Sequence, residues 1–300
     1  MPEEGIELTE RSNVMSIEEI IEIARVFVNL GVNKIRLTGG EPLIRKNIEK
    51  LLREIAAMGV ELAITTNGIL LDKFVDVFKE VGLKNINISL DTLDKEKSIF
   101  ITKRDYFDRI IQNIDLMIEN NFNVKINVVA MNDVNKNEIL DFIEWTKNKP
   151  VTIKFIEFMP FKDNKWDWSK GVSFTEIIEM AKSKYDSGLT KVDDAKNDTT
   201  RHYQIKGYEG KFGVISSVTN PFCSTCNRMR LTANGRMKNC LFSNKETDLL
   251  TSYRNGEDIK PLILDSILNK KKERAGMDSF DKFSDESLNS DNRSMTAIGG

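Results

Sequence analysis

The whole cysteine content of this 300-residue chain lies in one short segment, at Cys223, Cys226 and Cys240. The C-x-x-C spacing lets one short turn present two thiolates to a single metal ion or cluster. The Asn234-Gly235 pair lies between two alternating segments and predicts a β-hairpin, which sets Met229 roughly opposite Cys240. We therefore expect the third thiol to return toward the first two, so that all three sulfur atoms share one site.

Three sulfur ligands leave one coordination position open. Structural zinc usually has four protein ligands, whereas iron–sulfur clusters are held by cysteine thiolates of this kind. His202 is the single histidine of the chain and the candidate fourth ligand, although a lone histidine in a strand more often packs or points to solvent. The pattern favours an open [4Fe-4S] cluster, with a zinc site and three unrelated buried thiols as the alternatives.

Two arginines lie beside the thiols, at positions 228 and 230. In a strand this spacing projects both side chains from one face, and two fixed guanidinium groups suit recognition of a phosphate or a carboxylate. The alternative is a pair of solvated arginines on an edge strand.

The overall charge does not indicate a binding partner, because 44 Lys and Arg residues balance 46 Asp and Glu residues. This balance is typical of an ordinary globular protein and argues against a nucleic-acid coat or an acidic disordered tail. The chain has no run of about 18 uncharged apolar residues, and its first residues lack the pattern of a signal peptide. We expect no membrane span, no nucleic-acid partner and a cytoplasmic location, where the thiols stay reduced.

Strand-like and helix-like segments alternate through the first half of the chain. Ser16 and Glu19 form a capping-box pattern before a helix that ends at Gly31. The expected helices cover 16–30, 45–58, 72–81, 105–120 and 136–148, and the expected strands cover 33–38, 61–66, 84–91, 123–130 and 151–159. This order predicts an α/β fold with a parallel sheet and outer helices, either open or curled into a barrel.

Polar residues recur on one face of successive strands, whereas strands buried on both faces are nearly continuously apolar. The polar face is expected to carry Arg36, Thr38, Thr65, Asn67, Asn87, Ser89, Asp91, Lys125, Asn127 and Glu157. The alternate positions are apolar and suit packing against helices. A curled sheet with this inner face encloses a cavity for a hydrophilic, charged ligand. The alternative is a half-exposed sheet with a solvated face.

The regular alternation ends after Pro160. Residues 173–185 are expected to form a helix, 190–200 a polar connector and 201–219 β-strands, and the polar residues 270–294 a tail or loosely packed helix. We expect two domains, 1–160 and 161–300, with the cysteines in the second. The "LTGGEP" segment at 37–42 directly follows a strand, and its paired glycines let the backbone approach a ligand closely.

Several motifs resemble, in order along the chain, those of the GTP 3′,8-cyclases of molybdenum cofactor biosynthesis, which are radical S-adenosylmethionine enzymes. They are "LTGGEP" (37–42), "TTNG" (65–68), "SLD" (89–91), "INVVAMNDVN" (126–135), "FIEFMP" (155–160), "FCSTCNRMRL" (222–231) and the final "IGG" (298–300). The resemblance covers essentially the whole chain, and the ordered set is far more specific than any single motif.

The resemblance implies an incomplete (β/α) barrel of the radical S-adenosylmethionine type, closed by a C-terminal cluster-binding domain. A [4Fe-4S] cluster cleaves S-adenosylmethionine reductively in that family, and the resulting radical takes the 3′ hydrogen of GTP before C3′ bonds to C8. Carried over by motif, Gly40, Ser89 and Met159 contact S-adenosylmethionine, and Arg36, Thr65, Lys125, Arg228, Met229 and Arg230 hold GTP. The three cysteines hold a second [4Fe-4S] cluster that faces the guanine base, and the tail residues Gly299 and Gly300 reach into the site. A reducing electron donor and a downstream pterin-forming enzyme are the implied partners; a homodimer is left open.

One family motif is missing. The family's C-x-x-x-C-x-x-C segment, which binds the radical-generating cluster, lies just before an "MP" followed by acidic residues, and this chain starts at "MPEEG". We expect the chain as written to lack that cluster and the first barrel strand, as in an N-terminally truncated form. The alternatives are a non-catalytic GTP- or cluster-binding paralogue and a zinc-binding protein on the same scaffold.

Overall fold

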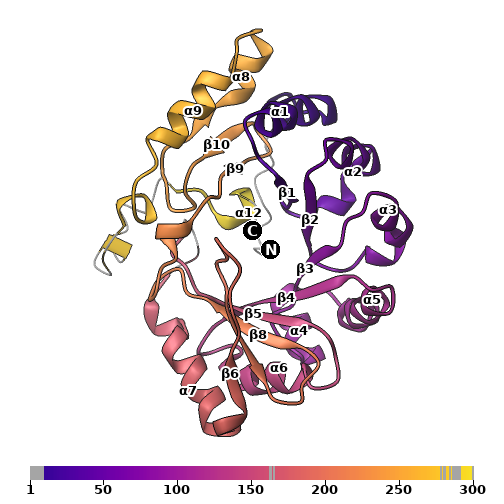
Figure 1. The fold of residues 1–300 in the computed structure, drawn as a ribbon, viewed down its shortest axis with the longest axis vertical. Helices are drawn as coiled ribbons and strands as arrows, with labels where there is room; N and C mark the ends of the chain where they lie inside the picture. Colours follow the sequence, from indigo (N-terminus) through magenta and orange to yellow (C-terminus); the bar gives the residue numbers. More distant parts are fainter. Residues whose placement is uncertain are drawn as a thin grey trace.

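Parallel strands and outer helices form a curled α/β sheet in the computed structural model, which describes residues 10–161, 164, 166–277, 279, 282–283, 285 and 292–298 (Figure 1). The strands of the main sheet are β1 (Lys34–Leu37), β2 (Glu61–Thr66), β3 (Asn85–Ser89), β4 (Asn123–Ala130), β5 (Thr152–Glu157), β6 (Leu189–Lys191), β7 (Arg201–Ile205) and β8 (Lys211–Ile215). Its helices are α1 (Ile17–Asn29), α2 (Ile48–Ala57), α3 (Val75–Glu80), α4 (Lys95–Thr102), α5 (Phe107–Glu119), α6 (Ile139–Trp145) and α7 (Phe174–Tyr185).

The main sheet is eight-stranded in the order β1-β2-β3-β4-β5-β8-β7-β6. The strands β1 to β5 pair in parallel, β8 pairs in parallel with β5, and β7 and β6 complete the sheet as antiparallel neighbours. Since β1 and β6 are not paired with each other in the described residues, the sheet is an incomplete barrel, as predicted. The sheet continues beyond residue 160 through β8. The division into domains at that residue stays a prediction.

The core lies between the outer face of the sheet and the helices. Ile64, Ile86, Ile126 and Ile153 occupy successive strands of this face and are all fully buried. Burying an aliphatic side chain of this size contributes about 1.5–3 kcal/mol. The apolar half of the predicted alternation is therefore confirmed, and it fixes which residues turn to the inner face.

Helix α1 begins at the predicted capping box: Ser16 Oγ accepts a hydrogen bond from the Glu19 amide at 3.1 Å, and Glu19 Oε2 accepts from the Ser16 amide at 2.6 Å. Helix α4 was not predicted. It begins at the cap Asp94 and buries only Ser98, so it lacks the apolar periodicity that reveals a helix in a sequence.

A C-terminal segment bridges back to the start of the chain. It contains β9 (Arg230–Leu231), β10 (Arg236–Lys238), β11 (Thr247–Asp248), α8 (Leu249–Arg254), α9 (Lys260–Leu268) and α12 (Met295–Ile298), and it lies next to α1 (Figure 1). Ile23 of α1 packs in one buried cluster with Met237 and Ile263. Arg254 Nε also donates to Glu19 Oε1 at 2.6 Å. The segment therefore covers the side of the ring next to β1. Within the described ranges, every helix is too short or too polar to cross a membrane.

Candidate functional site

The inner face of the sheet carries the polar row that the strand phase predicts. Thr65 pairs with Asn87, and Asn87 pairs with Lys125, across β2, β3 and β4. Arg36 reaches the same row from β1, where its Nη1 lies 3.5 Å from Thr65 Oγ1. The strand register thus brings Arg36, Thr65 and Lys125 onto one wall, as predicted.

Lys154 on β5 belongs to this wall, although the sequence reasoning did not select it. Its register partners are Asn127 on β4 and Gly213 on β8. Its side chain is only 8% exposed, and burial is the main cause that lowers its pKa to about 7; the charge of Lys125 lowers it further. The sequence held a signal for Lys154. The alternate positions Val151, Ile153 and Phe155 are apolar and buried against the helices, which leaves Lys154 on the opposite face.

Glu157 was wrongly assigned to the inner face. It pairs with Ala130 and follows the phase of Ile153 and Phe155, so it is fully buried on the helix side. Its Oε2 accepts hydrogen bonds from the amides of Val218 and Thr219 at 2.8 and 3.0 Å. Glu157 therefore holds the chain after β8 against the end of β5, and it does not face the cavity.

Positive charges converge from distant parts of the chain. Burial lowers the pKa of Arg36, and the nearby charge of Arg228 lowers it further. Burial and then the charge of Arg228 also lower the pKa of Arg230. The charges of Arg36 and Arg228 contribute to the lowered pKa of Lys154. We call Arg36, Lys125, Lys154, Arg228 and Arg230 the cation cluster.

Two carboxylates moderate this concentration of charge. Asp198, in the connector between β6 and β7, raises the pKa of Arg36, Lys125 and Lys154, and Glu61 raises that of Arg36 and Lys125. The same connector receives a hydrogen bond at 2.7 Å from Arg228 Nη2 to the Asn197 carbonyl oxygen. The cation cluster thus carries more positive than negative charge, which suits a polyanionic ligand.

The thiols lie beside this cluster. Cys223 begins the short 3₁₀ turn η7 (Cys223–Thr225). The carbonyl oxygen of Cys223 accepts a hydrogen bond from the Cys226 amide at 3.1 Å. Burial raises the pKa of Cys240, and the charges of Cys223 and Cys226 add to this shift, so the three sulfur atoms lie within electrostatic range of one another. All three are free and partly buried.

Lys270 adds positive charge at the thiols. Its Nζ lies 3.5 Å from Cys226 Sγ and 3.1 Å from the Arg228 carbonyl oxygen. Burial opposes ionisation of Cys226, but the Arg228 amide and the charges of Lys270 and Arg228 together lower its pKa. This setting favours the thiolate of Cys226, the form that binds metals. Across the described part of the chain, however, no group of three His, Cys, Asp or Glu side chains has the arrangement needed to bind a metal ion.

The hairpin predicted at Asn234-Gly235 forms, with Gly235 at φ +69°. Its pairing of Lys238 with Arg230 places Arg228, rather than Met229, at the continuation opposite Cys240. The predicted register was therefore wrong by one residue, because the turn closes between Thr232 and Gly235.

The three residues expected at S-adenosylmethionine lie at the carboxyl ends of parallel strands. Gly40 follows β1 and is exposed, with open space where a Cβ would stand. Ser89 ends β3 and is exposed, and Met159 follows β5, partly buried in a cluster that includes Cys240. Carboxyl ends of parallel strands meet at one edge of a sheet, so these positions share an edge.

A carboxylate next to Gly40 organises this edge. Glu41 Oε2 accepts from the Asn67 amide at 2.7 Å, and its Oε1 accepts from the Thr66 hydroxyl at 2.8 Å. The "LTGGEP" and "TTNG" loops are thereby fixed to each other.

The described part of the tail is tied to the hairpin. Lys238 Nζ donates to Asn292 Oδ1 at 2.6 Å, Arg293 pairs with Glu246 at 2.5 Å, and Ile298 is 5% exposed. Gly299 and Gly300 lie outside the described residues, so their expected role stays a prediction.

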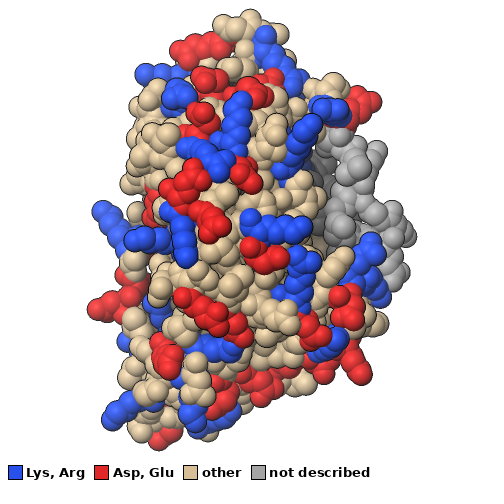
Figure 2. Space-filling view, turned by 90° about the vertical axis from the view of Figure 1, so that its right-hand side faces the viewer, with Lys and Arg blue, Asp and Glu red and all other residues tan. Residues whose placement is uncertain are grey.

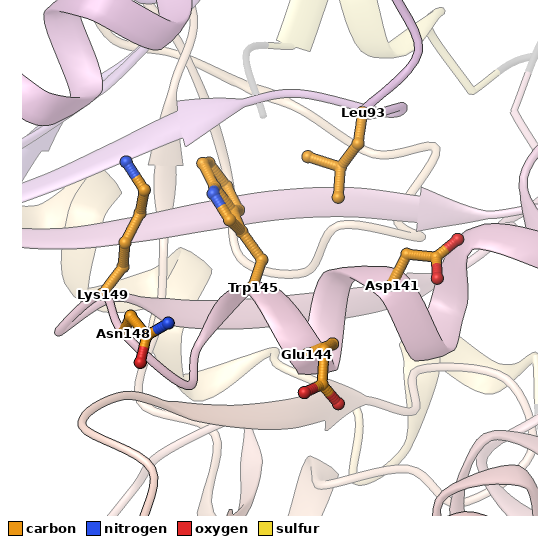
Figure 3. A pocket seen from close by; sticks show the side chains of 6 residues that line it. All are labelled: Leu93, Asp141, Glu144, Trp145, Asn148 and Lys149. Atoms are coloured by element: carbon orange, nitrogen blue, oxygen red, sulfur yellow. The ribbon is translucent and has the colours of Figure 1, made fainter.

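Two surface features contrast with the cation cluster. On the face over α1, α2 and α3, Lys and Arg side chains are interspersed with Asp and Glu (Figure 2). A surface hollow of about 410 Å³ lies near α6 and is lined by Leu93, Asp141, Glu144, Trp145, Asn148 and Lys149 (Figure 3). Glu144 in this hollow already accepts from Tyr208 and Tyr185 at 2.8 and 3.0 Å. Neither feature offers the concentrated charge or the thiols of the inner site.

The chain with this incomplete barrel is a protein of the radical S-adenosylmethionine class. The family model of the radical SAM superfamily matches residues 3–146, and that of Molybdenum Cofactor Synthesis C matches residues 151–276. A solved structure of Streptococcus suis SuiB bound to S-adenosylmethionine has a similar fold, with a TM-score of 0.53 and 17% identity over 80% of this chain and 58% of SuiB.

Two curated relatives specify the family. The mitochondrial GTP 3′,8-cyclase of Arabidopsis thaliana is 42% identical over 306 residues, which cover 100% of this chain and 76% of the relative. Molybdenum cofactor biosynthesis protein 1 of Dictyostelium discoideum is 42% identical over 285 residues, 92% of this chain and 45% of the relative, so the chain spans about half of that longer protein. The chain belongs to the GTP 3′,8-cyclase family of molybdenum cofactor biosynthesis proteins.

Proposed function

We propose that this chain is the GTP- and cluster-binding part of a GTP 3′,8-cyclase of molybdenum cofactor biosynthesis. The reaction converts GTP, with S-adenosylmethionine and a reducing electron donor, to (8S)-3′,8-cyclo-7,8-dihydroguanosine 5′-triphosphate. The observation that carries the proposal is that Arg228 and Arg230 of the cysteine segment lie within electrostatic range of the cations on the inner face of the barrel. The product would pass to a downstream pterin-forming enzyme, and the reduced thiols suit the cytoplasm.

The cation cluster has the composition of a triphosphate site. Arg36, Arg228 and Arg230 supply guanidinium groups that donate in pairs to phosphate oxygens, and Lys125 and Lys154 supply compact charges. Thr65 adds a neutral hydroxyl beside Arg36, at 3.5 Å from its Nη1. Both lysines have lowered pKa values, mainly through burial, and a bound anion would favour the charged form of each.

Cys223, Cys226 and Cys240 are proposed to hold a [4Fe-4S] cluster, because cysteine thiolates are the ligands of such clusters. Three thiols, one of lowered pKa, lie beside Lys270 and the arginines, whose charges compensate a negatively charged cluster. With three protein ligands, such a cluster would supply one open coordination position to the guanine base of GTP. Met229, next to Arg228, would complete the GTP contacts from the same segment.

Gly40, Ser89 and Met159 are proposed to bind S-adenosylmethionine at the carboxyl edge of the sheet. The exposed Gly40 leaves room for close approach of the ligand, and Ser89 offers a hydroxyl. Radical generation in this class uses a further [4Fe-4S] cluster, and the three cysteines at 223–240 leave no other thiol in the 300 residues to hold it.

Calorimetry under anaerobic conditions tests the nucleotide assignment. We expect Arg228→Ala to weaken GTP binding by about 1–3 kcal/mol, because a charge-assisted contact is lost. Arg53→Ala is the matched control, since Arg53 pairs with Glu80 at 2.7 Å on the outer helices. Equal affinity in the wild type and the Arg228 variant would remove that residue from the site, and no GTP binding by the wild type would refute the proposal.

The cysteine count supports a second candidate, a GTP- and cluster-binding paralogue without radical chemistry. With the C-x-x-x-C-x-x-C segment supplied at the N-terminus, a cyclase would yield 5′-deoxyadenosine from S-adenosylmethionine under a strong reductant, whereas a paralogue would bind GTP but yield none. Iron, sulfide and zinc analysis of the anaerobically purified protein separates both from a zinc-binding scaffold, which would hold about one zinc and no iron.

A further inference from the structure

A buried acceptor on the inner wall has no partner among the described residues. The side chain of Asn87 on β3 is 7% exposed, and its Oδ1 accepts no hydrogen bond. Its Nδ2 lies 3.4 Å from Asn127 Oδ1. Buried polar groups are nearly always paired, so an unpaired oxygen on the inner face of the sheet suits a donor supplied by a ligand.

The neighbouring side chains cannot supply this donor in their present arrangement. Lys125, the register partner of Asn87, donates at 3.0 Å to Asn85 Oδ1 instead. Asn85 is also occupied at its Nδ2, which donates to Glu61 Oε1 at 2.9 Å. Thr65, the register partner on the other side, accepts from Arg36 Nη1, and its hydroxyl makes no hydrogen bond to Asn87 Oδ1. Among the buried side chains that the structure describes in this row, Asn87 therefore carries the unpaired acceptor.

The position of Asn87 limits the part of the ligand that it can contact. Its register partners Thr65 and Lys125 are both proposed GTP contacts, and it lies one side-chain step along β3 from Ser89, a proposed S-adenosylmethionine contact. It therefore lies where the two ligands would approach each other. Phosphate oxygens only accept hydrogen bonds, so they would repel Asn87 Oδ1, and the guanine base is assigned to the thiols. A ribose hydroxyl is the remaining donor of the nucleotide.

We propose that Asn87 is a specificity-determining residue that accepts a hydrogen bond from a ribose hydroxyl of the bound guanosine triphosphate. This inference rests on the proposed function, because it takes the triphosphate to lie in the cation cluster. A site built around such an acceptor rejects an analogue that lacks the hydroxyl, because the acceptor is then left buried and unpaired.

Competition between nucleotides tests this role without turnover. The affinities of GTP, 2′-deoxy-GTP and 3′-deoxy-GTP are measured by calorimetry on the anaerobically reconstituted protein. We expect the wild type to prefer GTP at least about tenfold over one of the deoxy analogues, as expected for a site that reads a hydroxyl. In Asn87→Ala and in the β-favouring Asn87→Val, we expect this preference to fall to within about twofold.

Two matched variants separate the acceptor from general disturbance of the wall. Asn85→Ala removes the neighbouring amide on the same face, whose groups are already paired, and we expect the GTP preference to persist even if absolute affinity changes. Asn87→Asp keeps an acceptor oxygen, and we expect it to keep the preference while it weakens all three nucleotides through charge repulsion. Thermal melts establish which variants are folded.

The outcomes separate the two hypotheses. A wild type that does not bind GTP overturns the proposed function. A wild type that binds GTP without preference, or alanine and valine variants that keep the preference, overturn only the role of Asn87. Loss of S-adenosylhomocysteine binding in these variants, with the GTP preference intact, also overturns it and would assign Asn87 to the other ligand.

Discussion

Lys154 gives the proposed nucleotide site a pH dependence that can be measured without turnover. Burial is the main cause that lowers its pKa to about 7; the positive charges of Lys125, Arg36 and Arg228 lower it further, and Asp198 opposes them. A bound triphosphate adds negative charge and favours the ammonium form. Nucleotide binding at a pH above about 7 is therefore expected to take up a proton.

The size of the effect follows from linkage. Suppose the pKa rises from about 7 in the free protein to an ordinary lysine value of about 10.4 in the complex. Uptake is then about 0.9 proton per nucleotide at pH 8, and binding is about eightfold weaker at pH 8.5 than at pH 7.5. Burial lowers the pKa of His202 in the nucleotide-free protein. The terminal phosphate, with a second pKa of about 6, is already ionised.

Calorimetry at pH 8 in two buffers of different ionisation enthalpy, Hepes and Tris, measures the proton uptake. Lys154→Arg keeps the charge at every pH in this range, and we expect it to bind GTP with the Lys154 contribution to uptake removed. Lys154→Met removes both the charge and the titration. Lys125, whose pKa is also lowered by burial, is coupled to Lys154 by charge, so its own contribution is measured separately in Lys125→Arg. Equal uptake in the wild type and the arginine variant, or no uptake in the wild type, would refute the reasoning.

Three further results are expected. Lys154→Met is expected to raise the free energy of unfolding of the nucleotide-free protein at pH 7 by about 1–4 kcal/mol in urea titrations, because an apolar chain replaces a desolvated ammonium group that is only 8% exposed; a lower midpoint would contradict this. Lys238→Met is expected to accelerate hydrogen exchange in residues 292–298, because it removes the 2.6 Å bond to Asn292; unchanged exchange would show that other contacts hold the tail. Ile23→Ala is expected to lower the free energy of unfolding by about 2–5 kcal/mol, because a fully buried side chain leaves a cavity between α1 and the C-terminal segment; a loss below about 1 kcal/mol would mean that this seam is loosely packed.

Much of the barrel could be predicted because strand phase and helix caps are local signals. The alternation around Ile64, Ile86 and Ile126 fixed the outer face, and therefore placed Thr65 and Lys125 on the inner one. The same rule failed at β5, where Glu157 was read by its charge rather than by its phase. A buried carboxylate that binds backbone amides looks, in sequence alone, like a cavity residue.

The convergence of charge could not be predicted in full, because it depends on tertiary contacts. Asp198 lies in a polar connector, and only the fold brings it near Arg36 and Lys154. Arg228 was selected for its spacing beside the thiols, yet its contact with the Asn197 carbonyl joins segments 31 residues apart. No periodicity connects such positions, so the composition of the cluster follows from the structure.

An anaerobic crystal structure of the reconstituted protein with GTP tests the central claim most directly. The account predicts triphosphate density among Arg36, Lys125, Lys154 and Arg230, with the guanine base toward the iron–sulfur cluster at Cys223, Cys226 and Cys240. A nucleotide bound elsewhere, or a metal-free segment with the three sulfur atoms apart, would contradict it.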